Sequence, residues 1–202
     1  MKLYYTPGAC SMAPHIVLRE ASFIFELEQV DLVKKRTAAG QDYYQINPKG
    51  YVPALRLDNG QILTEVAVIL QYLADRKPEA GLAPEPGSME RYRMMEWLNY
   101  LATEVHKQIG PLFNPQIPAE WRENQLAVLD RRFELVAEAL KDKQYILGEK
   151  FTVADAYLYT LLTWTRFLKI DLGKWPALKD YVARVAARPT IREVMKAEGL
   201  TR

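Results

Sequence analysis

The sequence has little cysteine, little histidine and almost no net charge. Cys10 is the only cysteine, so no disulfide can form within the chain, which argues against a secreted disulfide framework. The 2 histidines leave too few soft ligands for a structural zinc site. A formal charge of +2 is too balanced for a dedicated binder of nucleic acids or anionic membranes. We therefore expect a small molecule or a protein as partner, and no nucleic acid, membrane or metal.

Long hydrophobic runs are also missing. The most apolar window, residues 157–168, is interrupted by threonines and Arg166, which favours a buried helix over a bilayer span. The apolar residues before Pro7 fall far short of a signal-peptide core. A lone thiol fits a reducing compartment, so we expect a cytoplasmic protein. A composition of 49% hydrophobic and 26% charged residues excludes disordered, collagen-like and coiled-coil chains.

The chain divides into two halves of different character. Residues 1–78 alternate short strand-like and helix-like segments, whereas residues 88–202 show only helical periodicity. Residues 79–87, rich in Pro and Gly, form the expected linker. In the first half we expect strands over 3–6, 25–32, 53–58 and 61–64, a helix over 11–21, and a helix over 65–76 that Thr64 caps.

Two connections predict the topology of the first half. The helix between the first two strands makes these strands parallel neighbours. Asn59-Gly60 is a strong hairpin signal, which makes the last two strands antiparallel neighbours. This order of elements predicts an α/β domain of the thioredoxin type with a mixed four-stranded sheet.

The second half is predicted to be an all-α helical domain. Its clearest amphipathic stripe steps by three and four residues through Leu126, Leu129, Phe133, Val136 and Leu140. Farther on, Thr152 and Asp155 match a capping box ahead of an apolar helix. We therefore interpret Asp155 as a structural acid and not as a catalytic one.

Cys10 is the first candidate for chemistry. It lies between the first strand and the first helix, where helix-terminal N–H groups and the helix dipole favour an anion such as a thiolate. An inert buried cysteine is the alternative. Because no second cysteine follows, an internal dithiol cycle is excluded, and a redox cycle would need an external thiol.

Two backbone positions are candidates for binding a peptide. A cis bond between Val52 and Pro53 would leave the backbone polar groups before the proline free at a sheet edge, ready to pair with a peptide. An ordinary trans proline that opens a strand is the alternative. At Glu65 and Val66, a helix N-terminus offers amide donors to a carboxylate, and the Glu65 side chain suits an ammonium group; a plain helix start is the alternative here.

Several segments resemble one known family. The first half contributes Tyr5-Thr6-Pro7-Gly8-Ala9-Cys10-Ser11, Asn47-Pro48-Lys49-Gly50-Tyr51-Val52-Pro53-Ala54-Leu55 and Leu63-Thr64-Glu65. The second half contributes Trp97-Leu98-Asn99-Tyr100, Glu104-Val105-His106-Lys107 and Phe151-Thr152-Val153-Ala154-Asp155-Ala156-Tyr157. Together they are similar to the cytosolic glutathione S-transferases of the bacterial beta class. The resemblance implies a thioredoxin-like domain that binds glutathione, a helical domain that shapes an electrophile pocket, and a homodimer.

The resemblance also implies roles for individual residues. Cys10 and His106 would be catalytic, with Cys10 beside the glutathione sulfur and Lys107 near it. Glutathione would contact Ala9, Lys35, Val52, Pro53, Glu65 and Val66, and Lys35 would meet its glycine carboxylate. Asn99 and Glu104 would reach across from the partner subunit. Many relatives carry Ser where this chain has Val66, so one hydroxyl contact is lost, with about 1 kcal/mol of binding energy at stake.

Other aromatic and histidine residues are interpreted from spacing. Tyr157, Leu161, Trp164 and Leu168 share one side of a helix that either joins Phe113 in the electrophile pocket or is an ordinary core stripe. We expect Tyr4, Tyr5 and His15 to be packing residues.

The leading interpretation is a glutathione transferase that conjugates the glutathione thiolate to hydrophobic electrophiles, with glutathione as cosubstrate and no cofactor. One alternative is a glutathione-dependent thiol-disulfide oxidoreductase in which Cys10 forms a mixed disulfide. Another is a non-catalytic binding or regulatory protein of the same fold.

Overall fold

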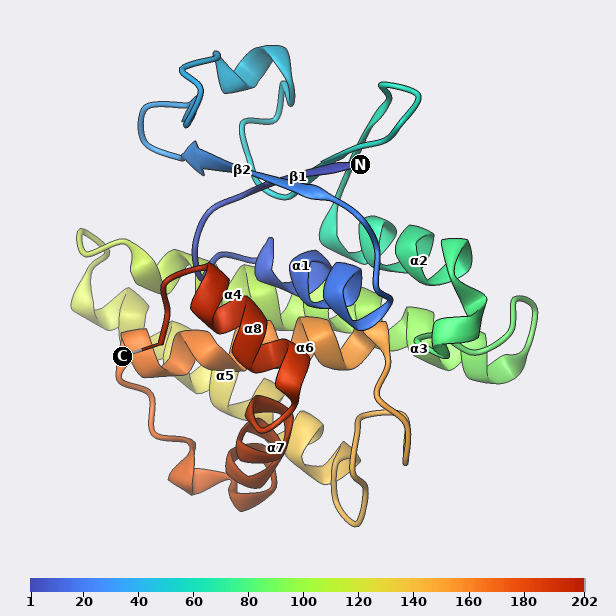
Figure 1. Ribbon diagram of the computed structural model, residues 1–202. Helices are drawn as coiled ribbons and strands as arrows, with labels where there is room; N and C mark the ends of the chain where they lie inside the picture. Colours follow the sequence, from blue (N-terminus) through green and yellow to red (C-terminus); the bar gives the residue numbers. More distant parts are fainter. Residues whose placement is uncertain (202) are drawn as a thin grey trace. The chain divides into compact units, whose positions relative to one another are not determined.

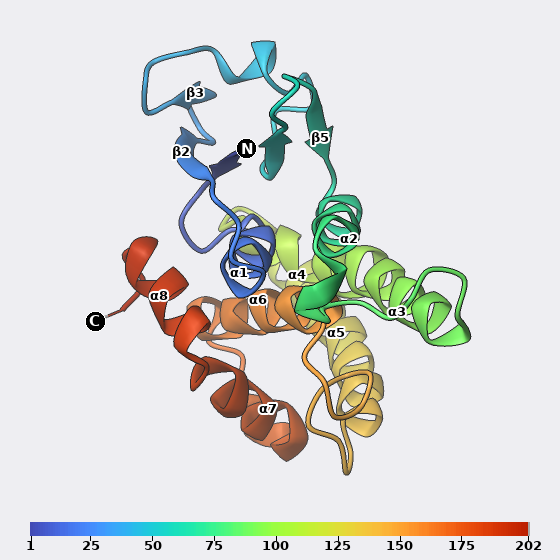
Figure 2. The same ribbon diagram turned by 45° about the vertical axis from the view of Figure 1, so that its right-hand side comes forward.

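The computed structural model describes residues 1–201, which form two units (Figures 1 and 2). Unit 1 contains Met1–Ala83 together with the C-terminal segment from Arg188, and unit 2 contains Pro84–Ala187. The sequence predicts that all of residues 88–202 belong to the helical domain. The C-terminal segment belongs instead to unit 1, because its helix packs on the first helix of the chain.

Unit 1 is built around a sheet with helices on one face, as Figure 1 shows. Its elements are β1 (Lys2–Tyr5), α1 (Met12–Glu20), β2 (Glu26–Asp31), β3 (Arg36–Thr37), the short 3-10 helix η1 (Tyr43–Gln45), β4 (Ala54–Arg56), β5 (Ile62–Thr64), α2 (Val66–Arg76), the 3-10 helix η2 (Pro78–Ala80) and α8 (Pro189–Ala197). Helices α1 and α2 pack side by side beneath the sheet, and α8 packs against α1, as both ribbon views show.

The sheet has the order β3-β2-β1-β4-β5. As predicted, β1 is parallel to β2, with Leu3 opposite Leu27, and β4 and β5 form an antiparallel hairpin around Asn59-Gly60. The observed sheet has five strands, one more than the four expected from the sequence. The additional strand, β3, is only two residues long and pairs with the end of β2, too short a pattern for periodicity to detect.

Helix α1 is buried almost all round. The predicted apolar face, Met12, Ala13, Ile16 and Val17, has no exposed surface. The expected packing residues Tyr4, Tyr5 and His15 are also buried. Pro14 falls in the first turn of α1, where its missing N–H costs no helical hydrogen bond.

Unit 2 consists of helices. Its elements are α3 (Met89–Tyr100), the π-helix η3 (Leu101–His106), α4 (Lys107–Ile109), the 3-10 helix η4 (Gly110–Phe113), α5 (Ala119–Ala139), α6 (Val153–Leu168), the 3-10 helix η5 (Leu172–Lys174) and α7 (Pro176–Ala186). The predicted stripe lies on α5 and just beyond it, and Leu129, Phe133, Val136 and Leu140 are buried. Within residues 1–201, no helix combines the length and apolar character that a membrane crossing requires.

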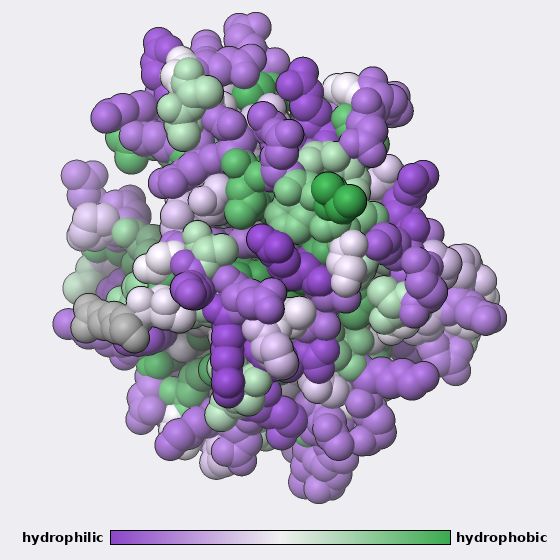
Figure 3. All heavy atoms as spheres, in the orientation of Figure 1, coloured by the Kyte–Doolittle hydropathy of each residue, from purple (hydrophilic) through white to green (hydrophobic). Residues whose placement is uncertain are grey.

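The surface is mixed in character. Figure 3 shows that hydrophilic side chains cover most of one face and that apolar side chains gather in patches between them. Ile24, at 95% exposure, and Val33, at 91%, are the most exposed of the large apolar side chains described. Isolated exposed apolar residues are common on soluble folds, so neither one by itself indicates a binding surface.

Candidate functional site

Cys10 lies in the loop between β1 and α1, as the sequence predicted. Its side chain is half-buried, and its thiol donates a hydrogen bond to the Val52 carbonyl oxygen at 3.2 Å. The preceding residue, Ala9, packs against the buried cluster that includes Tyr4 and Tyr43. Two residues that the resemblance places at the glutathione sulfur and backbone, Cys10 and Val52, are therefore in direct contact.

Two side chains that were not predicted as site residues bind the backbone of the segment before β4. The Tyr51 carbonyl accepts hydrogen bonds from the Tyr43 hydroxyl at 2.9 Å and from the Asn47 side-chain amide at 2.7 Å. Burial is the main reason that the pKa of Tyr43 is raised, which keeps its hydroxyl protonated and able to donate. An Asn-Pro pair signals a turn, but it does not say which carbonyl the asparagine will bind.

The Val52–Pro53 peptide bond is cis, the first of the two alternatives raised by the sequence. The Val52 N–H has no hydrogen-bond partner among residues 1–201, whereas its carbonyl accepts from Cys10. The expectation of a sheet edge was wrong, because β4 lies between β1 and β5. The N–H that remains to pair with a peptide therefore lies just before an interior strand.

Lys35 lies beside the same segment. Its ammonium donates to the Gly50 carbonyl at 2.8 Å and lies 5.5 Å from the centre of the Tyr51 ring. Gly50 has φ of +68°, and a Cβ there would come within 2.7 Å of a Tyr44 ring carbon. The positive φ and the nearby Tyr44 ring therefore favour glycine at this position.

Glu65 and Val66 begin α2, but the prediction that Thr64 caps this helix was wrong. Thr64 is the last residue of β5, and its hydroxyl accepts a hydrogen bond from Lys49 at 3.1 Å. Glu65 takes the N-cap position with φ of +71°, an uncommon conformation for a residue with a side chain, and its carboxylate pairs with Lys49 at 2.5 Å. Lys49 is a charged neighbour of Glu65 that the sequence analysis did not identify as a site residue.

Unit 2 brings together the four predicted residues His106, Phe113, Tyr157 and Trp164, which we call the aromatic cluster. His106 Nδ1 lies 2.7 Å from the Tyr157 hydroxyl oxygen, and the His106 and Trp164 rings meet edge to face with centroids 5.0 Å apart. Phe113, at 47% exposure, also meets the Trp164 ring edge to face, with centroids 5.6 Å apart. Because Tyr157, Leu161 and Trp164 are buried, these positions of the α6 stripe are core, but Tyr157 and Trp164 also contact His106, and Trp164 contacts Phe113.

The remaining predicted residues of unit 2 do not join this cluster through any contact described. Asn99 and Lys107 are exposed, and Glu104 pairs with Arg132 at 2.7 Å. Steps of four and three residues through Asn99, Thr103 and His106 would place these side chains on one face of a regular α-helix. Instead, the π-helix η3 begins after Asn99 and contains both Thr103 and His106, so the α-helical spacing no longer applies to these residues.

Asp155 is the structural acid that the capping box predicted. It is completely buried and accepts hydrogen bonds from the Thr152 N–H and hydroxyl and from the Ile146 N–H, each at 2.9 Å. The Tyr181 hydroxyl donates to it at 3.1 Å. These bonds satisfy a buried carboxylate and the start of α6, so the residue supports folding and not chemistry.

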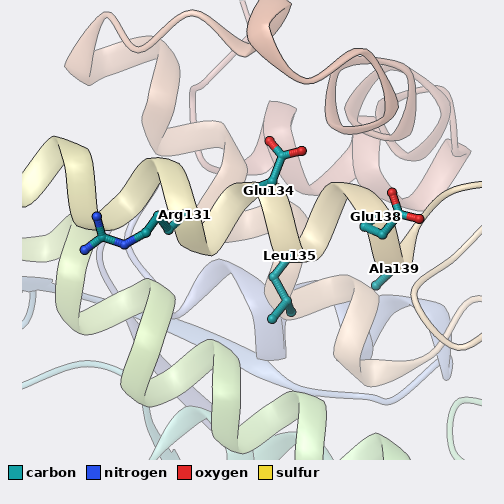
Figure 4. A pocket seen from close by; sticks show the side chains of 5 residues that line it. All are labelled: Arg131, Glu134, Leu135, Glu138 and Ala139. Atoms are coloured by element: carbon teal, nitrogen blue, oxygen red, sulfur yellow. The ribbon is translucent and has the colours of Figure 1, made fainter.

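An open hollow along α5 contains none of the predicted site residues. It is lined by Arg131, Glu134, Leu135, Glu138 and Ala139 (Figure 4). All of these side chains come from one helix, and nothing in its lining points to a ligand. Within residues 1–201, no three His, Cys, Asp or Glu side chains gather as a metal site would require.

Comparison with known proteins agrees with this arrangement. Residues 1–75 match the family model of the glutathione S-transferase N-terminal domain, and residues 100–189 match that of the C-terminal domain. The chain is 48% identical to glutathione S-transferase GstA of Escherichia coli O157:H7, over 99% of this chain and all of the relative.

Two solved structures are also similar over their whole lengths. One is the bacterial beta class glutathione S-transferase of Sphingomonas chungbukensis, with 43% identity, a TM-score of 0.96 and 100% coverage of both chains. The other is a sphingomonad glutathione S-transferase complexed with glutathione, with 43% identity, a TM-score of 0.95 and 100% coverage of both chains. The chain therefore belongs to the glutathione S-transferase family, and its similarity extends to a bacterial beta class member.

Proposed function

We propose that this protein is a glutathione transferase. The observation that carries the proposal is the contact between Cys10 and Val52, which lies beside a Val52 N–H with no partner among the described residues. A peptide bound in an extended form needs such an N–H, and a thiol next to it is close to the peptide's own sulfur. Family membership and a complex of a relative with glutathione support glutathione as that peptide.

The charges of unit 1 match those of glutathione, which has two carboxylates and one ammonium. Lys35 supplies a cation for the glycine carboxylate, although its ammonium already donates to the Gly50 carbonyl. The α2 N-terminus at Val66 supplies amide donors for the γ-glutamyl carboxylate, and Glu65 supplies a negative charge for the ammonium. Ala9 and Pro53 complete the proposed contacts.

The reaction would proceed through the ionised glutathione sulfur. The thiol proton leaves to water, the sulfur forms a bond to an electrophilic carbon, and a leaving group such as chloride departs with the electron pair of the broken bond. For addition reactions the carbanion formed takes up a proton. We propose that Cys10, His106 and Lys107 favour the thiolate and that the aromatic cluster supplies apolar surface for the electrophile.

A homodimer in the cytoplasm is part of the proposal. Asn99 is exposed and available to a partner subunit, whereas Glu104 would have to exchange its ion pair with Arg132 to reach the partner's glutathione. The mass of the protein in sedimentation equilibrium tests the dimer. A monomer at micromolar concentration would remove Asn99 and Glu104 from the site.

The proposal is tested by calorimetry with glutathione and by a steady-state assay with a chlorinated nitroaromatic electrophile. We expect Lys35→Ala to weaken glutathione binding about 10-fold, because a charge-assisted contact is lost. Lys34→Ala is the matched control, since Lys34 is the exposed neighbour and pairs only with Asp31 among the residues described. No binding to the wild type would refute the proposal. Binding without turnover across a panel of electrophiles and disulfides would support the non-catalytic alternative.

A second candidate function follows from Cys10 itself, which is only half-buried. In this function the Cys10 thiolate attacks the glutathione sulfur of a substrate's mixed disulfide with glutathione, forms a Cys10–glutathione disulfide and releases the substrate thiolate. A second glutathione thiolate then attacks the Cys10–glutathione disulfide, which restores the Cys10 thiolate and releases oxidised glutathione. Intact-mass measurement after exposure to oxidised glutathione tests this step. If the wild type forms no glutathione adduct, or if Cys10→Ala still forms one, the redox function of Cys10 is eliminated.

A further inference from the structure

A buried carboxylate from the end of the chain contacts the loop that carries Cys10. Glu198, which follows α8 in unit 1, has a side chain with no exposed surface. One of its oxygens, Oε2, accepts a hydrogen bond from the Gly8 N–H at 2.8 Å. The other, Oε1, lies 2.8 Å from His15 Nδ1. A single side chain therefore joins the β1–α1 loop to the helix α1 that follows it.

The Gly8 contact holds the middle of this loop. Thr6 is held at the loop's start, because its N–H donates to the Ser11 hydroxyl at 3.1 Å and its hydroxyl donates to the Val30 carbonyl at 2.7 Å. Gly8 has φ of +71°, and a Cβ there would lie 3.5 Å from a methyl group of Leu200. The Glu198 hydrogen bond thus reaches the loop two positions before Cys10, at a residue that has little room for a side chain beside Leu200.

The surroundings of His15 indicate that the carboxylate is the charged member of this group. His15 Nε2 is buried and has no hydrogen-bond partner among residues 1–201. A cationic imidazole would leave an unpaired N–H there, whereas a neutral ring that carries its proton on Nδ1 leaves only an unfilled lone pair. The His15 ring packs against the rings of Tyr5 and Phe25. The Arg19 guanidinium lies over the Phe25 ring, 5.0 Å from its centroid. Burial, and then the Glu198 charge, raise the pKa of Tyr5, so its phenol is neutral.

We propose that Glu198 is a positioning residue for Cys10. Its carboxylate fixes Gly8 through a charge-assisted hydrogen bond, and this sets where the Cys10 sulfur lies relative to the Val52 carbonyl. The inference rests on the proposed function for its effect on glutathione chemistry. Its effect on Cys10 itself is measurable without glutathione.

A second contact between α1 and an end of α8 allows positioning to be separated from general packing. Arg188, just before α8, binds Glu20 at the end of α1 through two hydrogen bonds of 2.8 and 2.9 Å. Loss of either pair weakens the attachment of α8 to α1. Glu198 also accepts from Gly8 in the Cys10 loop, whereas Glu20 binds Arg188 and Thr190, so Arg188→Ala is the matched control for loosened packing.

The test compares Glu198→Ala, Glu198→Gln and Arg188→Ala with the wild type, under conditions where circular dichroism shows each to be folded. Glu193→Ala is a surface control, because Glu193 is an exposed residue of α8. Two rates are followed by intact mass: alkylation of Cys10 by iodoacetamide across a pH series, in which sulfur displaces iodide, and formation of the Cys10 mixed disulfide with oxidised glutathione.

We expect Glu198→Ala to speed alkylation about 10-fold, because the loop no longer holds the thiol against Val52, and to slow the mixed disulfide by a similar factor. In Glu198→Gln we expect both rates within about threefold of the wild type, since the amide oxygen still accepts from Gly8 while the amide NH2 donates to His15 Nδ1 in the other neutral tautomer. Arg188→Ala and Glu193→Ala stay within about twofold of the wild type. If Glu198→Ala does not fold, Glu198→Asp takes its place, because its shorter side chain keeps the charge but does not reach Gly8.

The inference is overturned if Cys10 in Glu198→Ala, or in Glu198→Asp where that variant is used, is alkylated at the wild-type rate. It is also overturned if Arg188→Ala speeds alkylation as much as Glu198→Ala does. If the wild type neither binds glutathione nor forms the mixed disulfide, the glutathione functions fail. The alkylation series still decides whether Glu198 positions Cys10 in that case, because iodoacetamide requires no glutathione.

Discussion

Arg188 holds both oxygens of the Glu20 carboxylate, with Nε and Nη2 donating at 2.8 and 2.9 Å. The Thr190 hydroxyl donates to the same carboxylate. Burial tends to raise the pKa of Glu20, but the hydrogen bonds from Arg188 and Thr190 outweigh it and hold this pKa below its ordinary value of 4.5. The ionised carboxylate therefore joins the end of α1 to the start of α8.

The Glu20 pair predicts a loss of stability in acid. A carboxyl whose pKa is lower in the folded than in the unfolded state stabilises the fold above pH 4.5, and this contribution is lost as pH falls through the folded value. We expect Glu20→Gln to lower the free energy of unfolding by roughly 2 kcal/mol at pH 7, and by progressively less below pH 4.5. Urea denaturation from pH 7 to pH 3 measures the difference. An equal difference at both ends of this range would contradict the prediction, and exposed Glu193→Gln serves as the control.

Among Glu20, Glu65, Asp155 and Asp171, we expect Asp155 to contribute most to stability. Asp155→Ala leaves donors from Ile146, Thr152 and Tyr181 without their acceptor inside the protein, so we expect a loss of about 3 kcal/mol in the free energy of unfolding. Asp171→Ala is the control. Asp171 also caps a short helix through the Gly173 N–H, but it does so in the open, and we expect a loss below about 1 kcal/mol. Equal losses would show that burial of the cap is irrelevant.

Asp155 also predicts a pH dependence of opposite sign to that of Glu20. Burial raises the pKa of Asp155 to about 6, against the opposing effect of its hydrogen bonds. The folded state therefore binds a proton more tightly than the unfolded state, and the stabilisation from this proton is complete below pH 3.8 and is lost as pH rises through about 6. Asp155→Asn should remove this slope between pH 4 and pH 6 in urea titrations. A slope identical to that of the wild type would assign it to other groups.

The hydrogen bond between His106 and Tyr157 predicts a catalytic effect without a large stability effect. Tyr157→Phe removes the hydroxyl that orients the His106 imidazole. If His106 favours the glutathione thiolate as proposed, we expect kcat/KM for conjugation to fall about 10-fold in this variant. Tyr159→Phe on the same helix is the matched control, because Tyr159 is also buried and does not touch His106 in any contact described. The Tyr157 prediction fails if both variants have the same kcat/KM.

Glu65 predicts a loss of affinity without a loss of stability. Its ion pair with Lys49 is exposed, and exposed pairs contribute little to folding, so Glu65→Gln should change the free energy of unfolding by less than about 1 kcal/mol. If Glu65 binds the glutathione ammonium, the same change weakens binding about 10-fold. Calorimetry and urea denaturation separate the two effects, and exposed Glu26→Gln is the control. Unchanged affinity would exclude Glu65 from the glutathione site.

Local patterns in the sequence predicted most of the secondary structure. Asn59-Gly60 forms its hairpin because its backbone conformations suit a tight turn, and the Thr152–Asp155 capping box forms because its partners are three residues apart. The position of Cys10 between a strand and a helix also followed from local periodicity. Where the local pattern was short or interrupted, prediction failed: strand β3 has two residues, and the π-helix that ends at His106 changes a spacing that suits an α-helix.

The amino-acid sequence by itself determined the order of the elements, the family resemblance and the candidate residues, since each depends on residues close together in the chain. Only the tertiary structure decided what these residues touch. The contact of Cys10 with Val52 and that of Gly8 with Glu198 join positions 42 and 190 residues apart, and no periodicity extends over such separations. Packing of α8 on α1 brings the second pair together, because burying both apolar faces is favourable and the polar groups trapped between them must then find partners in each other.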